Sequence, residues 1–178
     1  MKEEDIGFMK RALDLATQAA LEGEVPVAAL IVCDRQLVAE VANLKESGFD
    51  PLGHAEIRAI QLAAKALGRW RLSGCTLYVT LEPCTMCAGA IVHSRVDRVV
   101  YGAKDPKAGA VESLYQILSD PRLNHAPEVV AGVLADESSA LLKSFFRARR
   151  TKRGFPSVVR PPKRGASLAG IRIVPSAC

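Results

Sequence analysis

Segments with helical periodicity alternate with short apolar runs along most of this chain, and no other feature of the sequence restricts its fold as strongly. Apolar residues recur every three or four positions in the helical segments, and β-branched residues fill the runs between them. We expect helices at residues 3–22, 54–67, 84–93 and 135–150, a short helix near 112–118, and strands at 25–33, 37–42, 76–80, 98–101 and 128–133. Single strands separated by helices form a sheet that is covered on both faces. The sequence therefore predicts one α/β domain.

The spacing within these segments makes two local predictions. Only three residues, Asp34–Gln36, separate the first two strands, which favours an antiparallel hairpin. In the second predicted helix, the apolar residues that share one face are Ile57, Ile60, Ala64 and Leu67.

The charge of the chain is divided unevenly along its 178 residues. All 19 acidic residues precede residue 143, whereas ten of the 24 basic residues follow residue 142. A basic segment joined to an acidic body is typical of proteins that bind a polyanion such as nucleic acid. Residues 154–178 contain four prolines, three glycines and no acidic residue. We therefore expect a domain over residues 1–153, followed by a disordered basic tail over residues 154–178.

Targeting signals and cysteine usage bear on the compartment. Residues 1–5 resemble neither a secretory signal nor a transit peptide. The longest apolar run, Val25–Cys33, is the length of a strand, whereas a membrane-spanning helix needs about 20 residues. We therefore expect a soluble, cytoplasmic protein with no membrane partner. In that compartment a Cys-x-x-Cys pair favours metal or redox chemistry over a disulfide framework.

Two polar clusters open predicted helices and carry residue types that bind zinc. His54-Ala55-Glu56 begins one helix, and Cys84 and Cys87 lie three residues apart at the start of another. That spacing turns both sulfurs in the same direction, as one tetrahedral zinc requires. Because a strand precedes each helix, both clusters are expected at the same end of the sheet. The sequence therefore predicts a zinc site that joins His54 to the two cysteines.

The number of protein ligands decides between a structural and a catalytic zinc, because a catalytic zinc keeps one position open for water. His93 lies on the opposite side of its helix from Cys84. Cys33 and Cys75 lie in apolar, strand-like segments and are expected in the core. The position of His125 in a loop does not exclude it by spacing. Three ligands with an open fourth position is the favoured prediction.

Glu56 follows His54 by two residues and therefore lies beside the predicted metal without being a ligand. A carboxylate there can take a proton from zinc-activated water and return it to a leaving group. This combination of groups can hydrolyse a C–N bond.

His54-Ala-Glu56 together with Pro83-Cys84-x-x-Cys87 resembles the signature of the zinc-dependent nucleoside and nucleobase deaminases. The resemblance implies the cytidine deaminase-like fold, a three-layer α/β/α sandwich with a central mixed five-stranded sheet. It also implies one zinc per subunit, bound by His54, Cys84 and Cys87, and a general acid/base role for Glu56.

Residues outside the zinc motif carry a narrower resemblance over about residues 5–150. The segments are Glu24-Val-Pro-Val27, Thr76–Cys84, Met86–Gly89, His93-Ser-Arg95 and Phe145-Phe-Arg147. They are similar to the bacterial tRNA wobble-adenosine deaminases. This resemblance implies conversion of the wobble adenosine to inosine, a tRNA anticodon stem-loop as partner, and a homodimer.

The same resemblance implies roles for individual residues. Asn43 would hydrogen-bond the flipped-out adenine, and Asp105 would lie near the neighbouring ribose. The residues that would line or close the pocket are Val27, Ala55 and Pro83. The residues that would contact RNA are Lys107, Phe145, Phe146, Arg147, Arg149 and Arg150.

The last predicted helix supports an RNA partner on physical grounds, because it separates two kinds of side chain. Lys143, Arg147 and Arg150 fall on one face and can meet phosphate. The apolar face, expected to dock on the body, comprises Leu141, Leu142, Phe145 and Phe146.

Two other functions remain open at this point. A deaminase of free guanine or cytosine would share the zinc site but would not need a basic C-terminal helix. A zinc-stabilised RNA-binding module without catalysis would require a fourth protein ligand on the metal.

Overall fold

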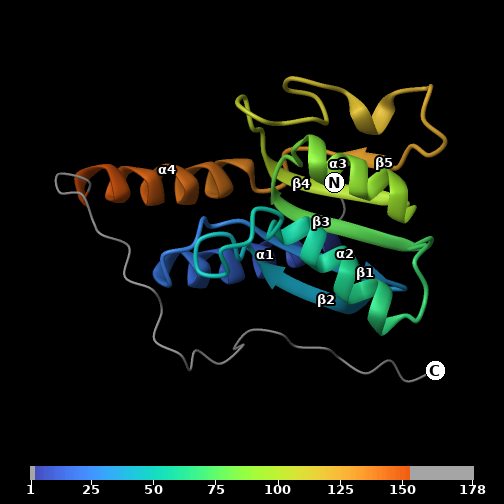
Figure 1. Ribbon diagram of the computed structural model, residues 1–178, viewed down its shortest axis with the longest axis horizontal. Helices are drawn as coiled ribbons and strands as arrows, with labels where there is room; N and C mark the ends of the chain where they lie inside the picture. The colour runs from blue at the N-terminus through green and yellow to red at the C-terminus, as the bar shows by residue number, and fades with distance from the viewer. Residues whose placement is uncertain (1–2, 153–178) are drawn as a thin grey trace.

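Five strands form one mixed sheet at the centre of the computed structural model, which describes residues 3–152 (Figure 1). The strands are β1 (Ala28–Cys33), β2 (Gln36–Ala42), β3 (Cys75–Leu81), β4 (Arg98–Ala103) and β5 (Glu128–Val130). Their order across the sheet is β2-β1-β3-β4-β5. β1 pairs with β2 and β3 in antiparallel orientation, while β4 pairs with β3 and β5 in parallel orientation. The expected mixed five-stranded sheet is confirmed.

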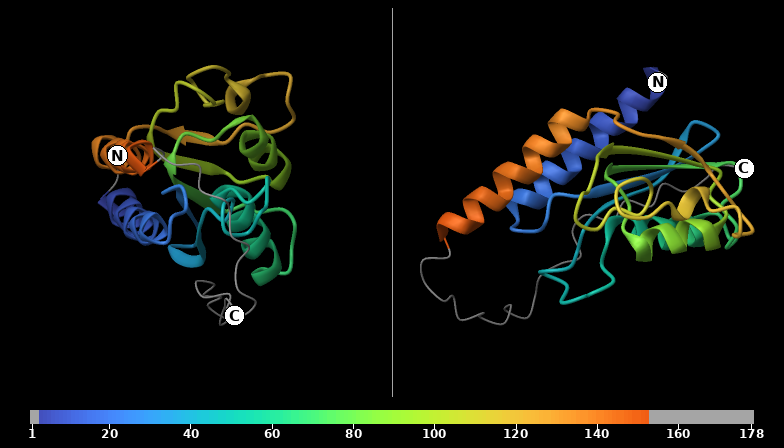
Figure 2. Two further views of the ribbon diagram at one scale, coloured as in Figure 1. Left: turned by 60° about the vertical axis from the view of Figure 1, so that its left-hand side comes forward. Right: turned by 90° about the horizontal axis from the view of Figure 1, so that it is seen from above.

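Helices cover both faces of this sheet (Figure 2). α1 (Glu3–Leu21) and α4 (Ala135–Lys152) lie side by side on one face, and α2 (Ala55–Ala66) and α3 (Thr85–Ser94) cover the other. A short 3-10 helix, Ile117–Ser119, is the only helical turn in the long segment between β4 and β5 within the described residues. The three-layer α/β/α sandwich is therefore confirmed, whereas the predicted tail at 154–178 lies outside the described residues.

Side chains of the central strands alternate between two apolar cores. Ile31 and Leu77 pack with α2 and α3, while their neighbours Leu30 and Tyr78 pack with α1. Because both faces are covered, apolar residues occupy successive positions of β1. No described helix combines the length and the apolar character that a membrane span requires.

The hairpin between β1 and β2 is confirmed, with a turn shorter than expected. Asp34 and Arg35 both have positive φ, 49° and 63°, and Cys33 pairs directly with Gln36. Two central residues in this conformation match the right-handed twist of the flanking strands. The link is therefore a two-residue turn.

The buried face of α2 differs from the apolar stripe in its sequence. The residues of α2 buried against the sheet are Ala55, Glu56, Ala59 and Ala63. Ile60 and Leu67 are only partly buried, at the margin of the core. Because an alanine side chain is a single methyl group, this face lets the helix pack close to β1 and β2.

Candidate active site

The strand directions bring three chain segments to one edge of the sheet. β2, β3 and β4 run in the same direction, so all three end at this edge, named here the carboxyl edge. Asn43 follows β2, the loop to Cys84 follows β3, and Asp105 lies just after β4. Ligand sites in open α/β sheets lie at this edge for the same topological reason.

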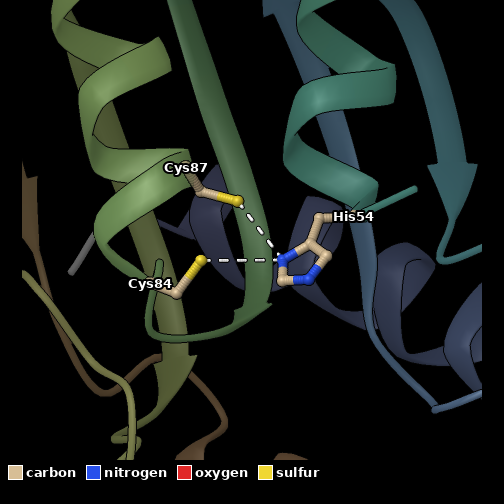
Figure 3. A group of neighbouring side chains, drawn as sticks. All are labelled: His54, Cys84 and Cys87. Atoms are coloured by element: carbon tan, nitrogen blue, oxygen red, sulfur yellow. Dashed lines mark hydrogen bonds between the residues drawn. The ribbon is translucent and has the colours of Figure 1, made fainter. Parts of the chain in front are cut away.

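His54, Cys84 and Cys87 converge at the carboxyl edge (Figure 3). His54 Nδ1 lies 3.6 Å from Cys84 Sγ and 3.5 Å from Cys87 Sγ. His54 is the N-cap of α2 and Cys84 is the N-cap of α3. The positive ends of two helices therefore point toward this cluster, which favours thiolate charge.

The separations in this cluster fit a tetrahedral metal. Donor atoms on one zinc with the usual Zn–N and Zn–S bond lengths lie roughly 3.6 Å apart. The three ligand atoms all lie within 4.8 Å of one another, and no other group of three such residues occurs among residues 3–152. Two cysteine sulfurs and one imidazole are also a donor set that zinc prefers.

The two remaining histidines lie away from this cluster. His93 is exposed on α3. His125 Nε2 makes a 2.7 Å hydrogen bond with the carbonyl of Val96, which precedes β4 at the opposite edge of the sheet. His125, which spacing alone left open, therefore does not complete the ligand set. Among the described residues, a tetrahedral metal held here would have three protein ligands and an open fourth position.

Hydrogen bonds within the cluster shift the pKa values of the two thiols in opposite directions. The hydrogen bond from Cys87 and the one from His54 lower the pKa of Cys84 to about 4, although burial opposes this shift. The same hydrogen bond to Cys84 and burial raise the pKa of Cys87. The hydrogen bond to Cys84 raises the pKa of His54. One sulfur is therefore held as a thiolate, the form that binds metal.

Glu56 lies in the first turn of α2, beside the cluster, with only 4% of its surface exposed. Its carboxyl group contacts Cys87, and burial raises its pKa. A buried carboxyl whose pKa is raised can hold and release a proton near neutral pH, as general acid/base catalysis requires.

A cavity of about 730 Å³ opens over the cluster. His54, Glu56 and Cys84 line it, and so do the predicted substrate residues Val27, Asn43 and Asp105. The other residues that line it are Val25, Lys45, Leu81, Glu82, Ala103, Lys104, Pro106, Lys107, Ala108, Ser139, Leu142, Lys143, Phe146, Arg149 and Arg150. The cavity therefore joins the metal cluster to a rim rich in lysine and arginine.

Two predicted pocket residues lie behind the cavity lining. Ala55 is fully buried, and its methyl group packs in the core beneath α2. Its backbone N–H donates a 2.8 Å hydrogen bond to Asn43 Oδ1, which orients the Asn43 side chain. Pro83 is also buried, and its carbonyl accepts a hydrogen bond from the Ala110 N–H. The described lining thus differs from the predicted one at Ala55 and Pro83.

The last turns of α4 close one side of the cavity, because this helix extends beyond the sheet (Figure 1). Phe146 lines the cavity together with basic residues, so the apolar and basic faces are not separated as expected. The Arg149 guanidinium lies 5.0 Å from the centroid of the Phe145 ring and 3.6 Å from the Glu46 carboxylate. Of the predicted RNA contacts, Lys107, Phe146, Arg149 and Arg150 line the cavity, whereas Phe145 and Arg147 are outside the described lining.

Sequence analysis missed three residues at this site. Lys45, Lys104 and Glu82 line the cavity, and Glu82 has only 2% of its surface exposed. The only signal for the lysines was their position in the sequence, Lys45 two residues after Asn43 and Lys104 directly before Asp105. For Glu82 it was an acidic residue between a strand and a predicted ligand.

Comparisons with known proteins agree on one class of enzyme. The family model of the MafB19-like deaminases matches residues 3–150. A tRNA-specific adenosine deaminase of Bacillus subtilis strain 168 is 49% identical over 146 residues, which cover 82% of this chain and 91% of that protein.

Solved structures extend this agreement to the fold. A structure from work on A-to-I editing by tRNA:A34 deaminases at the wobble position of transfer RNA has a TM-score of 0.74 and 47% sequence identity. The match covers 76% of this chain and 99% of that chain. A guanine deaminase from Nitrosomonas europaea has a TM-score of 0.64 and 28% identity, over 77% of this chain and 81% of that one.

Proposed function

Because this chain belongs to the family of MafB19-like deaminases and is 49% identical to two tRNA-specific adenosine deaminases, we propose that it converts the wobble adenosine of a tRNA to inosine by hydrolysis. The observation that carries this proposal is a three-ligand metal cluster with a buried glutamate beside it, under a cavity with a basic rim. Water replaces the amino group of the adenine ring in this reaction, and ammonia leaves.

The donor set and the separations of His54, Cys84 and Cys87 support zinc as the cofactor, one ion per subunit. A zinc ion with an open position lowers the pKa of its bound water to about 7 and so supplies a nucleophile at neutral pH. His54, Cys84 and Cys87 would hold the ion beside the cavity. Asn43 fixes the first turn of α2 through the Ala55 N–H, and this turn also carries Glu56.

Glu56 is proposed to carry the protons of the reaction. Its carboxylate accepts the proton that the attacking water loses and delivers it to N1 of the adenine. It then passes the second proton of the water to the departing amine, which leaves as ammonia. Burial supports this shuttle, because a carboxyl whose pKa is raised accepts protons at neutral pH more readily than an exposed one.

The cavity wall has groups suited to a purine base. Val25, Val27 and Leu81 supply apolar surface, and Asn43 supplies a polar group. Asn43 Oδ1 accepts the Ala55 N–H, so its amide nitrogen is the group available to a ligand. An anticodon loop is already single-stranded, and turning its wobble base into this cavity therefore costs little.

The rim of the cavity supports an RNA substrate over a free base. Lys45, Lys104 and Lys107 come from the segments that follow β2 and β4, and Lys143, Arg149 and Arg150 come from α4. Cations around a nucleotide-sized opening are suited to the phosphates that flank the flipped base. A free base carries no phosphate and would not use this rim.

The proposal is tested by incubating the zinc-loaded chain with a wobble-adenosine stem-loop and measuring inosine by nuclease digestion and mass spectrometry. We expect inosine only at the wobble position, and a Glu56→Gln variant that keeps its zinc but loses about 10²–10⁴-fold in turnover. Unchanged turnover of this variant contradicts the role of Glu56. Ammonia release from free guanine or cytosine, without inosine in the RNA, favours the free-base deaminase. Zinc-dependent RNA binding without either product favours the non-catalytic module.

Three further predictions belong to the same proposal. The deaminase domain spans residues 1–153, which is supported by the family match over residues 3–150. The protein acts in the cytoplasm, where tRNA is used. It forms a homodimer, and light scattering of the purified chain should give twice the mass of 19.1 kDa.

A further inference from the structure

Glu82 is a buried carboxylate in the cavity lining, with 2% of its surface exposed. It lies between the end of β3 and Cys84. None of the described ion pairs involves Glu82, so backbone and hydroxyl groups are its described partners. A buried charge without a cationic partner requires several hydrogen bonds to remain stable.

The hydrogen bonds to Glu82 come from one loop, residues 104–113. Oε2 accepts the N–H of Asp105 at 2.9 Å and the hydroxyl of Ser113. Oε1 accepts the N–H groups of Val111, Glu112 and Ser113 at 3.1, 2.8 and 2.9 Å. Both ends of the loop are therefore fastened to one carboxylate.

The loop is shaped closely around this carboxylate. A side chain at Gly109 would overlap the Glu82 carboxyl group and lie 2.6 Å from the Asp105 carbonyl. The Ala110 N–H donates to the Pro83 carbonyl at 2.8 Å. Gly109 and Cys84 pair as an isolated antiparallel β-bridge. The loop is thus fastened to the same few residues that carry a metal ligand.

The same loop forms a wall of the cavity through Lys104, Asp105 and Lys107. Asp105 is held by its backbone as well as by its side chain, because Oδ1 accepts the Lys107 N–H at 2.9 Å. We propose that Glu82 is a positioning residue, whose carboxylate sets the 104–113 loop so that Asp105 meets the substrate at a fixed distance from the metal cluster. This inference rests on the proposed function, since it assigns Asp105 to the substrate.

A carboxylate suits this position because all its hydrogen bonds are accepted ones. A glutamine of the same size would turn an N–H₂ group toward backbone N–H donors and lose at least one of these bonds. Hydrogen bonds to a charged acceptor are also stronger than those to a neutral one. Glu82→Gln should therefore loosen the loop while leaving the space that the side chain fills unchanged.

The chain offers a matched control on the other side of the cavity. Glu24 is also buried, and its carboxylate accepts the N–H groups of Val25, Glu46 and Ser47. Glu24→Gln therefore replaces a similar buried carboxylate, one that holds the 44–53 loop through hydrogen bonds. That loop does not carry Asp105. Loss of general stability should affect both variants alike.

The experiment measures kcat/KM on a wobble-adenosine stem-loop for Glu82→Gln and Glu24→Gln, each with Asp105 intact and with Asp105→Ala, at equal zinc content. We expect Glu82→Gln to lower kcat/KM about tenfold when Asp105 is present and less than about threefold when it is absent. Glu24→Gln should cost the same factor in both backgrounds. Equal factors for Glu82→Gln in both backgrounds would overturn the proposal.

Ser113→Ala provides a gentler variant, because it removes one hydroxyl donor from Glu82 and leaves the charge in place. We expect it to lower kcat/KM about threefold with Asp105 present and to have no effect with Asp105→Ala. An equal loss in both backgrounds contradicts a positioning role even if Glu82→Gln does not fold.

Amide hydrogen exchange separates this inference from the proposed function, because it needs no substrate. Ser113→Ala should accelerate exchange at Asp105 and Glu112 but not in β3. Unchanged exchange there rejects the positioning role. Absence of inosine with the unaltered chain, together with accelerated exchange, rejects the proposed function and leaves the loop's dependence on Glu82 established.

Discussion

The two edges of the sheet contain the same kinds of side chain and use them differently. Cys84, Cys87 and His54 meet at the carboxyl edge and form a cluster that could hold a metal. The opposite edge, where β3 and β4 begin, is named here the amino edge, and it also carries two cysteines and a histidine, Cys33, Cys75 and His125. There, no metal-binding group of three residues forms among the described residues.

The contacts at the amino edge explain this difference. Cys33 and Cys75 are direct partners in the antiparallel pairing of β1 with β3. Burial and the neighbouring Cys33 raise the pKa of Cys75 to about 12, so it is a neutral thiol at pH 7. Asp97 Oδ2 accepts the Gly74 N–H at 2.7 Å. No three ligand atoms converge at this edge among the described residues.

Cysteine substitutions test this comparison with the largest expected effect. Cys87→Ala should lose its zinc and at least about a thousandfold in activity, since the metal site is then incomplete. Cys75→Ala should keep one zinc per chain and activity within about threefold, at a stability cost of about 1 kcal/mol. Metal analysis and kcat/KM measure both. Zinc retained by Cys87→Ala, or lost by Cys75→Ala, would contradict the division between the edges.

An ion pair at the amino edge is expected to contribute to the stability of the fold and not to metal binding. The Asp5 carboxylate accepts two hydrogen bonds from Arg98, at 2.7 and 3.0 Å, and one from the Tyr78 hydroxyl. The side chain of Asp5 is 1% exposed. Asp5→Ala should therefore lower the free energy of unfolding by about 3–5 kcal/mol, because it leaves the Arg98 charge without its buried partner.

Denaturant unfolding measures this loss, with Glu128→Ala as control. Glu128 also pairs with Arg98, but its side chain is 62% exposed, so its removal should cost less than about 1 kcal/mol. A similar loss in the free energy of unfolding for the two variants would show that burial of the carboxylate does not determine its contribution to stability. Loss of zinc from folded Asp5→Ala would show that the edges are coupled.

A glycine substitution tests the close packing of the carboxyl edge. Gly109→Ala should displace the 104–113 loop, because its methyl group would overlap the Glu82 carboxyl group. We expect about a tenfold loss in kcat/KM with zinc retained. Gly7→Ala on α1 is the control, since nothing lies within 4 Å of the added methyl group. It should raise the free energy of unfolding by roughly 0.5–1 kcal/mol without changing kcat/KM.

Substitutions of basic residues at the two edges should give the smallest difference of these tests. The property that they change is RNA affinity. Arg150 lines the cavity, whereas Arg71 stacks on exposed Trp70 in the segment before β3. Arg150→Gln should weaken stem-loop binding about three- to fivefold and reduce the salt slope by about 0.7–0.9, the share of one phosphate contact. Arg71→Gln should change neither. Fluorescence anisotropy over a salt series measures the affinity and the salt slope of each variant. A salt slope of Arg150→Gln equal to that of the unaltered chain would show that Arg150 contacts no phosphate.

Local sequence signals predicted the elements and the metal cluster. Helical spacing and the Cys-x-x-Cys pair act over a few residues, and the elements that carry His54 and Cys84 occur close to where spacing predicted them. The expected direction of the strands brought them together. The buried alanine face of α2 was not predicted, because hydrophobicity alone favours isoleucine and leucine as the core stripe.

The sequence by itself determined which residues can bind a metal, since ligand chemistry and helix caps are properties of neighbouring residues. Only the tertiary structure decided that His125 lies at the amino edge, that α4 closes the cavity, and that Glu82 holds the loop carrying Asp105. Glu82 accepts hydrogen bonds from four backbone N–H groups that are distant in the sequence. The N–H of Asp105 is 23 positions away, and the other three are 29–31 positions away. Backbone N–H groups are common to nearly every residue, so such contacts leave no pattern in the sequence and arise only when the chain folds.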